Sequence, residues 1–219
     1  MTEERWLSST DQFSLLGYAH RQGRVRKVRL YSCACCRAAN QLHQNAWVRK
    51  AIERGESYAD GELADSTIER WRREAEKLWV SVRGFEPLPH IAAVYLAVED
   101  ACRHTTDGHY RWAWKRLSSR PESMGQHSEA NVEAILLPLL RDIFGNPFRP
   151  VVFDPEWRTS AAVALAVQMY DSRDFGTMPI LADALQDAGC DSADILDHCR
   201  EPGPHVRGCW VVDLVLGKE

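Results

Sequence analysis

Apolar residues recur at alternating steps of three and four along most of this 219-residue chain. That spacing places side chains on one face of an α-helix, where they can be buried together. It predicts a helix over residues 24–44 and a second helix that begins near Ser66. The two stripes are Val28, Tyr31, Cys35, Ala38 and Leu42, and then Ile68, Trp71, Ala75, Leu78 and Val82.

Helical patterns continue through the rest of the chain. Residues 89–104 and 128–146 are predicted to be helical, and Pro138 should kink or divide the second of these because it lacks a backbone donor. Shorter helices are expected over 159–170, 178–189, 192–200 and 205–217. The last segment is rich in β-branched residues, but no second strong strand candidate exists to pair with it. We therefore predict an all-α fold, a multi-helix bundle with a smaller helical C-terminal unit.

A proline-rich break separates the two parts. The stretch FGNPFRPVVFDPEW, residues 144–157, holds three prolines and a glycine, and the residue before each proline favours extended geometry. The expected organisation is a helical domain over residues 1–145, a connector over 146–158 and a small helical unit over 159–219.

Composition points to an ordinary globular protein, with 45% hydrophobic and 26% charged residues. No run approaches the roughly 18–20 apolar residues that a membrane-spanning helix needs, and the amino terminus lacks the pattern of a secretion signal. The seven cysteines are an odd number, which favours reduced thiols over a disulfide framework. We expect a cytoplasmic protein.

Charge is divided unevenly along the chain. Residues 1–120 hold 20 Lys and Arg against 15 Asp and Glu, a net charge of +5, while residues 121–219 hold 7 against 16, a net charge of −9.

Within residues 109–120, aromatic side chains alternate with cations, a mixture that can stack on bases and neutralise phosphate. Arg111, Trp114, Lys115 and Arg116 are the candidates for contact with nucleic acid or another partner. The alternative is an amphipathic helix whose rings face inward beneath long cationic stems.

The C-terminal segment carries the best candidates for metal ligands. Cys190, His198, Cys199, His205 and Cys209 lie within twenty residues of one another. His205 and Cys209 are four positions apart, a spacing that lets two ligands of one helix chelate a metal. From these five we predict Cys190, Cys199, His205 and Cys209 as the ligands of a possible zinc site.

A structural interpretation competes with the metal. Small thiols are often buried as compact apolar groups, and a buried Asp213 would need a partner such as Arg207 or His205. In this favoured interpretation the polar residues of the segment fasten the core and bind no cofactor.

A catalytic thiol is a further alternative. Arg29 and Arg37 lie four residues on either side of Cys33, and positive charge lowers the pKa of a thiol. The chain contains no GxGxxG, GxxxxGK[ST], HExxH or GxSxG motif. No catalytic residue is therefore predicted.

Three segments resemble a family of uncharacterised helical proteins found in planctomycetes. They are RWLSSTDQFSLLGYAHRQGRVRKVRLYSCACCR, LLRDIFGNPFRPVVFDPEW and MPILADALQDAGCDSADILDHCREPGPHVRGCWVVDLVLGKE. The resemblance implies an accessory or interaction domain that occurs in many copies, and it carries over no catalytic or cofactor-binding residue.

The sequence as a whole favours a non-catalytic interaction or regulatory module of a larger bacterial complex, with another protein as its partner. The first alternative is a zinc-stabilised accessory protein that binds nucleic acid. A thiol-dependent enzyme is the third hypothesis.

Overall fold

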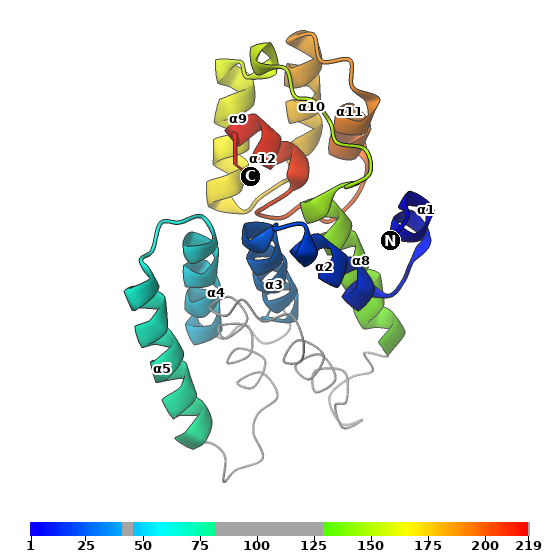
Figure 1. Ribbon diagram of the computed structural model, residues 1–219. Coiled ribbons are helices and arrows are strands. Elements are labelled where there is room, and N and C mark those ends of the chain that lie inside the picture. Colours follow the sequence, from blue (N-terminus) through cyan, green and yellow to red (C-terminus); the bar gives the residue numbers. More distant parts are fainter. Residues whose placement is uncertain (41–45, 82–128, 219) are drawn as a thin grey trace. The chain divides into compact units, whose positions relative to one another are not determined.

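The computed structural model describes residues 1–40, 46–81 and 129–218. Within these ranges the regular structure is helical, no strand is present, and the predicted all-α class is confirmed (Figure 1). The α-helices are α1 (Glu3–Ser8), α2 (Gln12–Arg21), α3 (Val25–Asn40), α4 (Ala46–Ala59), α5 (Asp65–Ser81), α8 (Glu129–Phe144), α9 (Ser160–Ser172), α10 (Met178–Asp187), α11 (Ala193–Arg200) and α12 (Trp210–Leu216), with a short 3₁₀ turn, η2 (Pro155–Trp157).

The chain forms two compact units, each described by itself below. The terminal unit comprises Met1–Ser9 and Pro138–Glu219, and the central unit comprises Thr10–Leu137. Pro138, inside the continuous helix α8, is the first residue of the second terminal-unit segment. The expected connector over 146–158 lies wholly within the terminal unit, since residues on both sides of it belong there.

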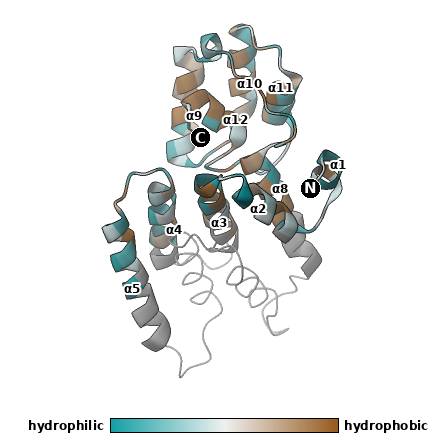
Figure 2. Cartoon of the chain, viewed as in Figure 1, coloured by the Kyte–Doolittle hydropathy of each residue, from teal (hydrophilic) through white to brown (hydrophobic). Residues whose placement is uncertain are grey.

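Helices α9 to α12 form the body of the terminal unit. Helix α10 packs against both α9 and α11, and α12 contacts α9 and α11. Their shared core includes Ala166, Met169, Leu181 and Leu185, each 0% exposed, and the rings of Tyr170 and Phe175. Figure 2 shows hydrophobic residues concentrated on α9, α10 and α12. The predicted helices over 159–170, 178–189 and 192–200 therefore exist, with ends shifted by a few residues.

Local sequence sets the ends of these helices. The Thr159 side chain accepts a hydrogen bond from the Ala162 N–H at 3.3 Å and so caps the start of α9. Pro179 stands in the first turn of α10, where its missing N–H costs no hydrogen bond. Gly217 adopts the left-handed conformation that ends α12.

The first nine residues belong to the terminal unit through specific contacts. Trp6 is 1% exposed, and its indole Nε1–H donates to the Gly145 carbonyl at 3.0 Å. Arg141 donates to the Leu7 carbonyl at 2.8 Å, and Asn146 donates to a Glu3 carboxylate oxygen at 2.8 Å. The amino-terminal segment is thus bound to the last turn of α8 and to the residues that follow it.

Gly145 is required at the end of α8 for two reasons. Its φ of +59° lies in the left-handed region that other residues rarely adopt, and a Cβ there would lie 3.0 Å from Cγ of Trp210. The turn after α8 can therefore pass closely over the indole of Trp210 only because residue 145 has no side chain.

The central unit is built around the pair α3 and α4, with α2 against α3 and α5 against α4. Tyr31 and Cys35, from the predicted stripe of α3, are 1% and 2% exposed. Two ion pairs fasten the unit: Arg37 meets the buried Glu56 at 2.7 Å, and Arg26 meets Asp60 at 2.9 Å. Because Glu56 is almost fully buried, its pair with Arg37 compensates a charge that would otherwise be costly.

Tyr31 gives the central unit a testable pH dependence. Burial first, and then the neighbouring Cys35, raise the pKa of its phenol well above 10.0. Above pH 10 the unfolded chain therefore loses this proton while the folded chain keeps it, and the free energy of unfolding should fall by about 1.4 kcal/mol per pH unit. Urea unfolding between pH 8 and 11 measures this slope. Tyr31→Phe should make it shallower by about that amount, and an unchanged slope would contradict the assignment.

No helix in the described ranges combines the length and the apolar character needed to cross a lipid bilayer.

Candidate functional site

Four metal-binding side chains converge inside the terminal unit. One ligand atom from each of Asp142, His198, His205 and Cys209 lies within 4.8 Å of the corresponding atoms of the other three. We call this set the four-donor cluster. It contains two predicted ligands, His205 and Cys209, and two residues outside the predicted set, Asp142 and His198.

Four different parts of the fold supply these residues. Asp142 lies in the last turn of α8, His198 in α11 and His205 in the loop after α11, while Cys209 is the N-cap residue of α12. Asp142 is 4% exposed and Cys209 is 0% exposed, so the cluster belongs to the interior. The chain must complete its tertiary fold before these groups meet.

Asp142 is the hub of the hydrogen bonding. Its Oδ1 lies 2.7 Å from Nδ1 of His205 and 3.2 Å from Nε2 of His198. Its other oxygen, Oδ2, accepts the backbone N–H of Val206 at 2.9 Å. The Val206 amide therefore fixes the carboxylate with Oδ1 directed at the histidines.

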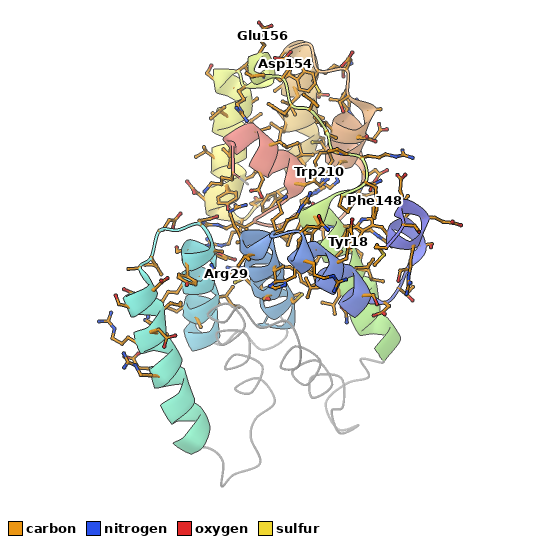
Figure 3. The ribbon with its side chains drawn as sticks, in the orientation of Figure 1. Tyr18, Arg29, Phe148, Asp154, Glu156 and Trp210 are labelled. Atoms are coloured by element: carbon orange, nitrogen blue, oxygen red, sulfur yellow. The ribbon has the colours of Figure 1, made fainter. Side chains whose placement is uncertain are left out.

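The second contact of His198 completes the cluster. Its Nε2 lies 3.2 Å from Sγ of Cys209 as well as 3.2 Å from Oδ1 of Asp142. The ring is held from the side by His205, with ring centroids 4.9 Å apart, and by Trp210, at 5.1 Å. Figure 3 labels Trp210 at the start of α12, next to Cys209 in sequence.

The pKa values of the carboxylate and the thiol are shifted in opposite directions. Burial acts to raise the pKa of Asp142, but its hydrogen bonds with His198 and His205 and their nearby charges outweigh burial, and the pKa is lowered. For Cys209, burial and then the Asp142 charge raise the pKa well above 9.0, although the backbone amides of Val212 and Val211 act in the opposite direction. Without a cation, the cluster contains an ionised Asp142 and a neutral Cys209.

This arrangement does not match a catalytic cysteine–histidine–aspartate triad. In such a triad the histidine contacts the nucleophile with one ring nitrogen and the carboxylate with the other. Here His198 uses the same atom, Nε2, for both contacts. A thiol that is 0% exposed with a raised pKa is also poorly placed to attack a substrate.

The structure separates the other two predicted ligands from the cluster. Cys190 follows α10 and is 3% exposed, and Cys199 lies on α11 and is 1% exposed. Burial and the nearby Cys190 raise the pKa of Cys199 to about 12. Both behave as the compact buried groups of the structural interpretation.

The helical chelate predicted for His205 and Cys209 is wrong. Helix α12 begins only at Trp210, so His205 lies in an irregular loop. Gly208, with φ +96°, interrupts any helix between His205 and Trp210. The two side chains still meet, because the loop folds back on α8.

The structure revises one of the two predicted partners of Asp213, namely His205. His205 pairs with Asp142, and the guanidinium carbon of Arg207 lies 4.4 Å from the ring centroid of Tyr170. Asp213 itself is 1% exposed within α12.

Asp142 is the member of the four-donor cluster that the sequence analysis missed. Its signal is a carboxylate within the apolar run LLRDIF, where the neighbouring Ile143 and Phe144 are 0% and 3% exposed. A charged residue at such a position needs a specific partner. His198 was one of the five potential ligands in the sequence, but it was not among the four predicted to bind zinc.

The remaining sequence candidates are placed elsewhere or lie outside the described residues. Cys33 is buried in α3, while the Arg29 guanidinium lies 4.5 Å from the ring centroid of Tyr58 and Arg37 pairs with Glu56. Figure 3 labels Arg29 in the central unit. The predicted contact residues Arg111, Trp114, Lys115 and Arg116 fall outside the described ranges.

Compared with protein-family models, with curated proteins and with solved structures, the chain matches none.

Proposed function

We propose that this protein is a non-catalytic accessory module of a larger bacterial complex, and that it binds another protein in the cytoplasm through an acidic surface of the terminal unit. The observation that carries the proposal is the concentration of exposed carboxylates over residues 171–201. The surface is defined by Asp171, Asp174, Asp183, Asp187, Asp191, Asp194, Asp197 and Glu201, all of them exposed.

This surface carries many more negative than positive charges. Its eight carboxylates are accompanied by only two basic residues in the same range, Arg173 and Arg200. Arg200 is engaged with Asp183 at 3.0 Å and with the Gln186 side chain at 2.6 Å. The remaining charge steers a basic surface of a partner and repels nucleic acid, since phosphates carry the same sign.

Helix α10 adds an apolar contact to the acidic surface. Ile180, Asp183 and Asp187 follow steps of three and four, so they share one face of α10. Ile180 is 54% exposed. An exposed apolar residue with two carboxylates on the same helix face offers a partner both an apolar and a charged contact.

The alternatives have narrower support. The nucleic-acid hypothesis depends on Arg111, Trp114, Lys115 and Arg116, outside the described residues, while its zinc component has the four-donor cluster in its favour. A thiol enzyme has least support, because His198 offers a single nitrogen to both Cys209 and Asp142. The resemblance to planctomycete helical proteins stays a prediction.

A charge-neutralising variant tests the acidic surface. Asp187→Asn combined with Asp194→Asn should reduce recovery of partner proteins from a lysate of the native host at least several-fold, and should weaken the salt dependence of what remains. Quantitative mass spectrometry after affinity capture measures both. The control combines Glu4→Gln with Glu156→Gln, which removes two exposed charges of the same unit outside residues 171–201 (Figure 3 labels Glu156). Equal recovery with all three proteins would rule out this surface.

A further inference from the structure

We propose that Asp142, His198, His205 and Cys209 bind one Zn²⁺ ion, which forms a structural centre of the terminal unit. The ligand atoms are Oδ1 of Asp142, Nε2 of His198, Nδ1 of His205 and Sγ of Cys209. This inference is independent of the proposed function, because metal binding can be measured without any partner protein.

The distances suit a tetrahedral ion. With zinc bonds of about 2.0–2.3 Å, the donor atoms of a tetrahedral site lie about 3.3–3.6 Å from each other. Here both contacts of His198 are 3.2 Å, the contact between His205 and Asp142 is 2.7 Å, and no donor pair exceeds 4.8 Å. Zinc binding would move some donor atoms apart and others closer together, by on the order of 1 Å.

Hydrogen bonds alone do not pair the ring nitrogens of the two histidines one to one with partners. His198 Nε2 holds either one hydrogen or one lone pair, yet it has two partners at the same distance. His205 presents Nδ1 to Asp142, while its Nε2 is buried without a hydrogen-bond partner. A cation at the centre accepts one lone pair from each of the four residues and removes the competition at Nε2 of His198.

Charge balance selects a divalent cation. An imidazole nitrogen that binds a metal must offer a lone pair, so each zinc-bound histidine is neutral. With both histidines neutral, the charges of the Asp142 carboxylate and a Cys209 thiolate balance the two charges of Zn²⁺. The interior of the terminal unit then carries no net charge at this point.

The surroundings of the ligands also suit a metal. The Val206 N–H holds Oδ2 of Asp142 and leaves Oδ1 as a single ligand atom. The backbone amides of Val212 and Val211 favour the charged form of the Cys209 sulfur. Such hydrogen bonds from the outer shell orient ligands and tune their basicity.

The ligand types and their number identify zinc and a structural role. Two imidazoles, one thiolate and one carboxylate form a mixed set that suits zinc, whereas calcium and magnesium need a shell of oxygens. Four protein ligands fill a tetrahedral ion, so no position is open for a water or a substrate. The ion would join the end of α8, α11, the following loop and α12 at one point.

Metal content and cobalt spectroscopy on the full-length chain test the inference. Protein purified without chelators should contain about one zinc per chain by elemental analysis. Protein stripped of metal, with its thiols reduced, should take up one equivalent of Co²⁺. It should then show the visible bands of a tetrahedral ion together with a thiolate-to-cobalt charge-transfer band in the near ultraviolet.

A matched pair of cysteine variants locates the site. Cys209→Ser should abolish the charge-transfer band, whereas Cys199→Ser, the same change at an equally buried thiol outside the cluster, should keep it. Asp142→Asn and His198→Gln should each weaken zinc affinity at least tenfold in competition with a colorimetric chelator. The zinc content and cobalt spectrum of the wild-type protein test the proposal by themselves, so the test still holds if one of the variants fails to fold. Reduced wild-type protein that holds less than a tenth of an equivalent of zinc and binds no Co²⁺ would overturn the proposal, as would loss of the band in Cys199→Ser alone.

Discussion

Removal of zinc should lower the melting temperature of the terminal unit by roughly 15–30 °C. A ligand that binds only the folded state at a thousand times its dissociation constant contributes about 4 kcal/mol, and each kcal/mol corresponds to about 4–8 °C for a domain of this size. Asp142 explains why the loss is large, because its carboxylate is 4% exposed and would lose the cation that neutralises it. Calorimetry with and without a chelator, followed by addition of zinc, measures the shift and its reversal.

The loss of stability after zinc removal should be confined to the terminal unit. Hydrogen exchange of peptides from α11 and α12 should accelerate after chelation, while peptides from α3 should keep their rates, since no member of the four-donor cluster lies in the central unit. Cys209→Ser should melt at the low temperature with or without zinc. A chelator effect of the same size in Cys209→Ser would assign the shift to another site.

The helices that were predicted depend on local spacing, whereas α1, α2 and α4 were not predicted. The stripe that contains Tyr31 and Cys35 became the buried face of α3, and the short helices after residue 159 all exist. Their hydrophobic spacing, prolines and glycines are properties of neighbouring residues, which a sequence displays directly. The assignment of Met1–Ser9 to the terminal unit was not predictable in this way. It depends on contacts across more than 130 positions, such as that between Trp6 and Gly145.

The candidate site was only half predictable for the same reason. His205 and Cys209 lie close in sequence, and their spacing alone singled them out. Asp142 lies 63 positions before His205, so only the tertiary fold shows that they meet. The sequence did show a carboxylate inside an apolar run, and a search for the partners of buried charges would have included it.

Sequence proximity also misled the choice among the cysteines. Cys190 and Cys199 are as near to His205 along the chain as many ligand pairs are in zinc proteins, yet they pack in the core beside α10 and α11. A thiol at a helical core position satisfies the hydrophobic pattern without a metal, whereas a carboxylate at such a position does not. A buried carboxylate is therefore the more specific signal of this site.

Trp6→Ala should destabilise the terminal unit by about 3–5 kcal/mol, the usual cost of truncating a fully buried tryptophan. The side chain is 1% exposed, and its indole N–H is the donor to the Gly145 carbonyl. Trp6→Phe keeps much of the ring but removes the donor, and should cost less than the alanine variant while remaining above about 1 kcal/mol. Urea unfolding, followed by circular dichroism, measures all three proteins.

Leu7→Ala provides the matched control for this prediction, since Leu7 is the next residue of the same helix but is 50% exposed. It should change the free energy of unfolding by no more than about 0.5 kcal/mol. A large difference between the two alanine variants means that α1 is docked by its tryptophan and completes the core of a unit whose other residues begin at Pro138. If both variants fall within about 0.5 kcal/mol of the wild type, the first nine residues contribute no stability to that unit, and its core would have to be complete from Pro138 onward.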